Sequence, residues 1–160
     1  MNWQKNMHGK IDLSEIKLII LDLQGTLISE DEITDLNKLD LRILELNEFA
    51  KVCSLKGIKV IILSGINNNK VIKRIEEKSH VDLIHSSINK VDKANKIAAQ
   101  YNLEFDSIMF IGNDLLDIPL LKLAGVGAAP KTARREVKRI VDYVLPDDIL
   151  TFLTEKLNHS

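Results

Sequence analysis

The segment from Ile16 to Leu27 constrains the fold of this chain more than any other part of its sequence. An almost wholly apolar run, which reads as a buried strand, ends in Asp22 and is followed by Gly25 and Thr26. Open α/β sheets build their ligand sites at the carboxyl ends of buried parallel strands. We therefore expect Asp22 to project from the end of a central strand into a functional site.

Apolar runs of strand length alternate with segments of helical periodicity along most of the chain. This alternation is typical of a parallel sheet covered by helices on both faces, so the expected fold class is α/β with a Rossmann-like sheet. The expected strands are Ile16–Leu23, Ile58–Leu63, Val81–His85, Ser107–Ile111, Val126–Ala128 and Asp142–Leu145. The expected helices are Phe49–Lys56, Asn68–Lys78, Val91–Tyr101, Asp117–Leu123, Arg134–Val141 and Asp147–Leu157.

The segment Ser29–Leu46 departs from this alternation. Its apolar residues Leu39, Leu41, Ile43 and Leu46 favour a short extended excursion or hairpin over a crossover helix. The segment is too short to form a cap domain over the site. An extended excursion of this kind exposes apolar surface, which favours packing against another subunit.

Three later segments place polar groups after expected strands. Ser64 and Gly65 follow the second strand, where a hydroxyl and backbone N–H groups can hold phosphoryl oxygens. Lys90 or Lys93 follows the third strand, where an ammonium would neutralise a transferring phosphoryl group. Gly112–Asp117 follows the fourth strand with oxygen ligands of the kind that Mg²⁺ prefers. This order predicts phosphoryl transfer to an aspartate.

Composition narrows the possible partners. The 160 residues suit one domain, with 1–14 expected as a polar arm or linker and 15–160 as the domain. A net charge of −1 gives no large field for nucleic acid or anionic lipid. No apolar stretch approaches the roughly 18 residues of a membrane span, so we expect a cytoplasmic protein. The single cysteine, Cys53, excludes an intramolecular disulfide, and no Cys or His cluster predicts a transition-metal site.

In this order of residues the chain resembles the haloacid dehalogenase superfamily of phosphotransferases. The small size and the missing cap are most similar to its sugar-acid phosphatase branch. That branch includes 3-deoxy-D-manno-octulosonate 8-phosphate phosphatases and the phosphatase-like domains of acylneuraminate cytidylyltransferases. The matching residues are Asp22 for the nucleophile of the first motif, followed by Gly25 and Thr26, then Ser64 for the second-motif hydroxyl, Lys90 for the third-motif lysine and Gly112–Asp117 for the acidic fourth motif.

The resemblance implies that Asp22 attacks phosphorus and that water then hydrolyses the aspartyl phosphate. It implies Mg²⁺ as cofactor, held by Asp22, by the backbone carbonyl of Gln24 and by Asn113 or Asp114, with Asp117 able to compensate in part. The implied substrate is a small phosphorylated metabolite, and sugar-acid phosphates come first among the candidates. Members of the branch are commonly tetramers in which the segment after the first motif covers a neighbour's site.

Several departures from the family pattern bear on activity. Gln24 replaces the aspartate that protonates the leaving oxygen, and losing general acid–base catalysis typically costs about 10²–10⁴-fold in rate. Asn113 replaces the first fourth-motif aspartate. Ile66 stands where many relatives carry an arginine, which leaves Arg74 in the next helix as a candidate phosphate-binding cation. Pro146–Ser160 lacks the glycine- and arginine-rich tail of sugar-acid phosphatases.

Three hypotheses follow. The first is a slow Mg²⁺-dependent phosphomonoesterase that works through Asp22. The second is a catalytically impaired fold of the same family that serves as an oligomerisation or regulatory module. The third is a phospho-accepting receiver-like domain, which also uses an aspartate, a hydroxyl and a lysine around Mg²⁺. Receivers place their acidic pair before the phosphorylated aspartate, whereas this chain carries its acidic cluster after Asp22.

Overall fold

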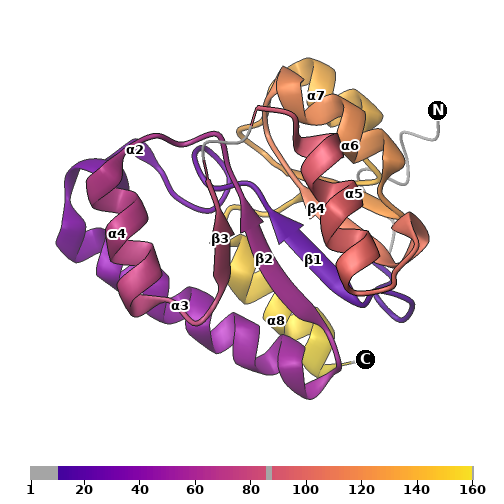
Figure 1. Ribbon diagram of the computed structural model, residues 1–160, viewed down its shortest axis with the longest axis horizontal. Helices are drawn as coiled ribbons and strands as arrows, with labels where there is room; N and C mark the ends of the chain where they lie inside the picture. The colour runs from indigo at the N-terminus through magenta and orange to yellow at the C-terminus, as the bar shows by residue number, and fades with distance from the viewer. Residues whose placement is uncertain (1–10, 86–87, 160) are drawn as a thin grey trace.

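Six parallel strands form one sheet across the described residues, in the order β3-β2-β1-β4-β5-β6 (Figure 1). The computed structural model describes residues 11–85 and 88–159, so most of the expected arm at 1–14 lies outside the described residues. The strands are β1 (Leu18–Leu21), β2 (Lys59–Leu63), β3 (Asp82–Ile84), β4 (Ile108–Ile111), β5 (Val126–Pro130) and β6 (Tyr143–Leu145).

Seven α-helices accompany the sheet within these ranges. They are α2 (Glu30–Thr34), α3 (Leu36–Leu55), α4 (Asn69–Lys78), α5 (Lys90–Gln100), α6 (Ile118–Leu123), α7 (Arg135–Ile140) and α8 (Ile149–Asn158). Single 3₁₀ turns precede β4 at Phe105–Ser107 and α6 at Leu115–Asp117. In the described part of the chain no helix combines the length and the apolar character that crossing a membrane requires.

The sheet is buried on both faces, which explains why its central strands carry no polar residue. In β1, Ile19 and Leu21 join the core that contains α3, α4 and α8, whereas Leu18 and Ile20 join the core that contains α5, α6 and α7. Figure 1 shows these two helical layers on opposite sides of the sheet. Alternate residues of a strand point to opposite faces, so only a continuously apolar strand satisfies both cores. The expected α/β fold class is confirmed.

The chain order creates a crevice next to β1. From β1 the chain moves outward to β2 and β3, then returns to the other side of β1 to form β4, β5 and β6. β1 and β4 end in register at Leu21 and Ile111, and the Asp22 N–H donates to the Ile111 carbonyl at 2.9 Å. The connections that leave these two strands diverge, and ligands bind at such switch points of open α/β sheets. The fold therefore places Asp22 at the switch point.

The expected extended excursion after the first strand is wrong, because Ser29–Leu46 is helical. In α3 one buried stripe recurs at helical spacing, and its members are Leu39, Ile43, Leu46, Phe49 and Cys53. Leu41, which made the pattern look alternating, is 63% exposed. The stripe packs in the protein's own core, so it no longer supports packing of this segment against another subunit. The tetramer stays a prediction from the resemblance alone.

Candidate active site

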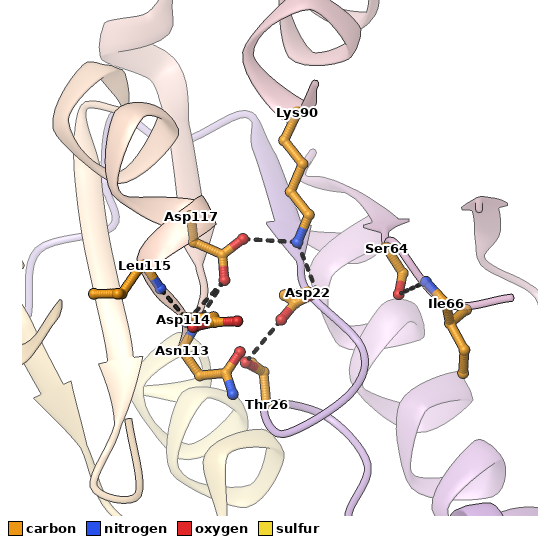
Figure 2. Close-up of polar contacts among 9 residues, drawn as sticks. All are labelled: Asp22, Thr26, Ser64, Ile66, Lys90, Asn113, Asp114, Leu115 and Asp117. Carbon is orange, nitrogen blue, oxygen red and sulfur yellow. Dashed lines mark hydrogen bonds and ion pairs between the residues drawn. The ribbon is translucent and has the colours of Figure 1, made fainter. Parts of the chain in front are cut away.

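Asp22 is buried at the carboxyl end of β1 and its carboxylate faces two partners. Its Oδ1 accepts a hydrogen bond from Lys90 Nζ at 2.8 Å, and its Oδ2 lies 3.5 Å from the Thr26 hydroxyl (Figure 2). The residue is 6% exposed. A carboxylate this deeply buried needs a charged partner, because an isolated ion in the interior is far less stable than in water.

Lys90 supplies that partner from the first turn of α5. Asn89 caps this helix by accepting from the Asp92 N–H at 3.0 Å, which fixes where the helix starts. Lys90 Nζ bridges Asp22 Oδ1 at 2.8 Å and Asp117 Oδ1 at 2.7 Å, and it lies 5.9 Å from the centre of the Phe110 ring. Of the two lysines expected from the sequence, Lys90 is therefore the one that reaches Asp22.

Burial and neighbouring charges shift the pKa of Asp22 and of Lys90. Burial raises the pKa of Asp22 from 3.8 to about 6, with a smaller contribution from Asp117 and an opposing one from Lys90. Burial alone would lower the pKa of Lys90, but the two carboxylates outweigh it and raise that pKa above its ordinary value. Lys90 is therefore a fixed positive charge that two carboxylates share.

Asp117 holds the loop after β4 in place. It is 1% exposed, and its Oδ2 accepts from the N–H groups of Asn113 at 3.0 Å and Asp114 at 3.1 Å, while Oδ1 binds Lys90. Both oxygens are thus committed to the protein. In this structure Asp117 orients the loop and the lysine, and its role as a metal ligand stays a prediction from the resemblance.

The loop after β1 contacts the loop after β4 through a glycine. Gly25 has φ +81°, and a Cβ there would overlap the side-chain amide of Asn113. Only glycine adopts this conformation readily and admits so close a neighbour. The Gly25 N–H donates to the Ile28 carbonyl at 2.8 Å and closes the turn. Asn113 is thereby brought against the turn that contains Gln24.

The oxygen donors that the resemblance implies for a cation belong to these two loops. Asp22 offers a carboxylate, Gln24 a backbone carbonyl, and Asn113 or Asp114 a side-chain oxygen, of which Asp114 already accepts from the Leu115 N–H at 2.7 Å. Across 11–85 and 88–159, no three His, Cys, Asp or Glu side chains are grouped so as to hold a metal. The expected donor set contains only oxygen atoms and little charge, which suits a hard cation that keeps waters and a phosphate among its ligands.

Ser64 lies at the end of β2, across the crevice from the acidic loop (Figure 2). Its Oγ accepts from the Ile66 N–H at 3.0 Å, and the residue is 1% exposed. A hydroxyl that accepts here still has its hydrogen to donate. Ser64 and the neighbouring Gly65 both line the cavity beside Asp22, so this turn can hold phosphoryl oxygens.

A cavity of about 560 Å³ opens above these groups. Sequence reasoning missed three of its lining residues, namely Glu30, Ile88 and Leu116. Glu30 accepts from Gln24 Nε2 at 3.4 Å. A signal for Glu30 was present, because Ser29 and Glu32 form a capping box that marks a helix start. The remaining lining residues are Asp22, Gln24, Gly25, Ser64, Gly65, Ile66, Lys90, Asn113, Asp114 and Asp117.

Arg74 does not line this cavity, which corrects the expectation that it contacts phosphate. Its Nη1 donates to Asp40 Oδ1 at 3.1 Å and to Oδ2 at 2.9 Å, and Lys78 Nζ binds the same carboxylate at 3.1 Å. The two cations of α4 are therefore paired with α3. Their charge stabilises the packing of two helices instead of serving the site.

Two curated relatives resemble parts of the chain. N-acylneuraminate cytidylyltransferase A of Danio rerio is 25% identical over 128 residues, which cover 78% of this chain and 30% of the relative. Phosphoglycolate phosphatase of Methanopyrus kandleri is 38% identical over 80 residues, which cover 46% of this chain and 34% of the relative. The chain thus spans about a third of the length of the curated relatives it matches.

The solved structures extend the likeness to the whole fold. 3-Deoxy-D-manno-octulosonate 8-phosphate phosphatase from Moraxella catarrhalis, solved with magnesium, phosphate and KDO, superposes with a TM-score of 0.72 at 18% identity and covers 98% of this chain and 90% of that one. At this identity the likeness establishes the fold alone. The family of haloacid dehalogenase-like hydrolases matches residues 66–148, just over half of the chain. The chain belongs to the haloacid dehalogenase-like hydrolases.

Proposed function

We propose that the protein is a phosphatase that hydrolyses a small phosphomonoester through a covalent phosphoryl group on Asp22. The observation that carries this proposal is the buried arrangement in which Lys90 bridges Asp22 at 2.8 Å and Asp117 at 2.7 Å. A buried ion pair of this kind is weak support for stability, so a functional role accounts for it better. It lies beside an open cavity at the switch point of the sheet.

The reaction proceeds in two steps. A carboxylate oxygen of Asp22 forms a bond to phosphorus while the bond from phosphorus to the leaving oxygen breaks, and the departing alkoxide takes up a proton. Water then attacks the phosphorus, the bond to Asp22 breaks, and inorganic phosphate leaves with the carboxylate regenerated. Lys90 offsets negative charge on the phosphoryl oxygens in both steps, and Ser64 with its adjoining turn holds those oxygens.

Mg²⁺ is the cofactor of this proposal. Asp22, the Gln24 carbonyl and Asn113 or Asp114 would hold it, and the oxygen-only donor set supports this assignment. When bound, the cation would neutralise charge on the phosphoryl group. The solved relative from Moraxella catarrhalis contains magnesium and phosphate, which is consistent with this cofactor.

Gln24 makes the enzyme slow. An amide neither gives nor takes a proton at neutral pH, so the leaving oxygen draws its proton from water or from the substrate itself. The alternative role, an inactive module, is not favoured. The nucleophile, the lysine and its positioning carboxylate are all in contact, and the cavity beside them is open.

Release of inorganic phosphate from a panel of phosphomonoesters with Mg²⁺ tests this function. We expect turnover with the unmodified protein and none with Asp22→Asn, which removes the nucleophile and keeps its shape. Asp31→Asn is the matched control, because Asp31 is exposed and does not line the cavity. Turnover that survives Asp22→Asn, or a complete lack of turnover across the panel, would contradict the proposal.

A further inference from the structure

The cavity around Asp22 is acidic apart from one ammonium. Its described lining residues contribute the carboxylates of Asp22, Glu30, Asp114 and Asp117, against the single ammonium of Lys90. That ammonium already binds two carboxylates, and its side chain is 10% exposed. An anionic group on the leaving part of a substrate would therefore find no cation of its own among these residues. A divalent cation in the site would be balanced by the dianionic phosphoryl group.

No arginine is among the described residues that line the cavity, and Arg74 and Arg134 are paired outside it. Arg74 binds both carboxylate oxygens of Asp40. Arg134 donates its backbone N–H to the Asn113 carbonyl at 3.2 Å, but its guanidinium lies 3.8 Å from Glu136, and the residue is absent from the cavity lining. Recognition of a carboxylate normally uses an arginine fork or a comparable set of donors. The described part of this site has no such group.

Part of the exposed lining of the cavity is apolar. Ile88 is 86% exposed and Leu116 is 70% exposed, and both line the cavity together with the buried Ile66. A carbon skeleton gains free energy by covering such surface, whereas a carboxylate there loses water without gaining a partner. Glu30, in the first turn of α2, adds an acceptor that suits a hydroxyl or an ammonium.

We propose that the substrate is a phosphomonoester whose alcohol carries no carboxylate. Its carbon skeleton lies against Ile88 and Leu116, and its hydroxyl or ammonium groups face Glu30. The inference rests on the proposed phosphatase function and narrows its substrate class. It separates this chain from a sugar-acid phosphatase, because a sugar-acid leaving group would bring a second anion to an acidic cavity.

Matched pairs of phosphomonoesters test this inference. O-Phosphoethanolamine and O-phosphoserine differ by one carboxylate, and glycerol 3-phosphate and 3-phosphoglycerate form a second pair. Each compound competes with an aryl phosphate in the presence of Mg²⁺, which yields its specificity constant or its inhibition constant. We expect the carboxylate-free member of each pair to be preferred by roughly 10- to 100-fold, the scale of one like-charge contact near a protein surface.

A charge reversal identifies the residue responsible. Glu30→Lys should reduce this preference to near unity or invert it, and Glu30→Gln should reduce it by a smaller factor. Asp31→Lys makes the same charge change one residue away, at an exposed side chain outside the cavity, and should leave the preference unchanged. Circular dichroism verifies that each variant is folded.

The possible outcomes separate the inference from the function on which it rests. The inference on substrate class would be overturned if both compounds of a pair were used equally, if the carboxylate-bearing compound were preferred, or if neither competed with the aryl phosphate. In each of these cases, turnover of the aryl phosphate would still support the phosphatase function. A preference that Glu30→Lys leaves intact would overturn the role of Glu30. Absence of all turnover would overturn both the phosphatase and its substrate class.

Discussion

Asp22 destabilises the fold in its charged form. Burial raises its pKa from 3.8 to about 6, so between these values the folded protein holds a proton that the unfolded chain has released. Protonated Asp22 therefore contributes favourably to the free energy of unfolding below about pH 4, and this contribution is lost as the pH rises through 6. Functional carboxylates are often held at such a cost to stability.

Asp22→Asn should consequently stabilise the metal-free protein near pH 7.5. The substitution removes the buried charge and preserves the shape, and we expect a gain on the order of 1–3 kcal/mol, scaled from about 1.4 kcal/mol per pKa unit. The gain should shrink as the pH falls through 6 toward 4, and it should approach zero below the unfolded-state pKa of 3.8, where Asp22 is protonated in both states. Thermal melts of both proteins with a chelator, from pH 4 to 8, measure this difference. A variant that melts lower at pH 7.5 would contradict the assigned burial cost.

Gln24→Asp should restore the missing proton donor. Gln24 is exposed and contacts Glu30 at 3.4 Å, so the shorter side chain leaves the core unchanged. We expect turnover of an aryl phosphate to rise by roughly 10²–10⁴-fold, the usual contribution of general acid–base catalysis. The gain should vanish when Asp22→Asn is added, because no covalent intermediate can then form.

The Gln24→Asp variant also distinguishes a slow enzyme from a catalytically impaired module. A folded variant that stays as slow as the original protein at saturating Mg²⁺ would mean that the loss of function extends beyond this position. The role of an oligomerisation or regulatory module would then be preferred. Steady-state kinetics of the single and double variants, run side by side, provide the comparison.

At the scale of elements, the strands could be predicted because burial on both faces forces continuous apolar runs. The run expected at Ile58–Leu63 is β2 at Lys59–Leu63, and the other expected strands agree to within two residues at each end. Helix α3 could not be recognised in its first half, because Leu39, Leu41 and Ile43 mimic strand alternation. Which of these leucines faces the core depends on α8 and α4, which pack on α3 from distant parts of the chain.

The same distinction applies to the site. Asp22, Ser64 and Lys90 could be predicted because each follows a strand of a parallel sheet, and parallel strands end at one edge. The contact of Arg74 with phosphate could not be excluded from sequence, because its partner Asp40 lies in the part of α3 whose pattern resembles a strand. Ile88 and Leu116 reach the cavity only through the packing of two separate loops, which no local pattern reports.

The buried stripe of α3 yields a prediction for this element. Leu46 is 1% exposed, whereas Leu44, two residues earlier on the same helix, is 61% exposed. Leu46→Ala should lower the free energy of unfolding by about 2–5 kcal/mol, because it leaves a cavity in the core. Leu44→Ala should change it by only about 0.5 kcal/mol. Denaturant unfolding of both variants measures the difference, and similar losses at the two positions would contradict the helical assignment.

For the whole molecule, the site joins the two halves of the sheet. Asp22 follows β1, Ser64 follows β2 on one side of it, and Asn113 follows β4 on the other side. A cation bound between the loops after β1 and β4 would therefore link the two halves of the sheet. Because the unfolded chain lacks this arrangement, Mg²⁺ should raise the free energy of unfolding by mass action. The increase is about 2.7 kcal/mol when the cation is at a hundredfold excess over its Kd.

The affinity for Mg²⁺ should be weak, and one substitution should strengthen it. Asn113 offers a neutral oxygen where a carboxylate would add charge, and cation affinity rises with the number of charged ligands. Asn113→Asp should lower the Mg²⁺ concentration that half-saturates the thermal shift by roughly tenfold, equivalent to about 1.4 kcal/mol. Asp22→Asn should abolish the shift, and Asp31→Asn should retain it.

A thermal unfolding midpoint that stays constant up to tens of millimolar Mg²⁺, both in the original protein and in Asn113→Asp, would remove the metal from the mechanism. The phosphatase would then have only Lys90 to offset the phosphoryl charge.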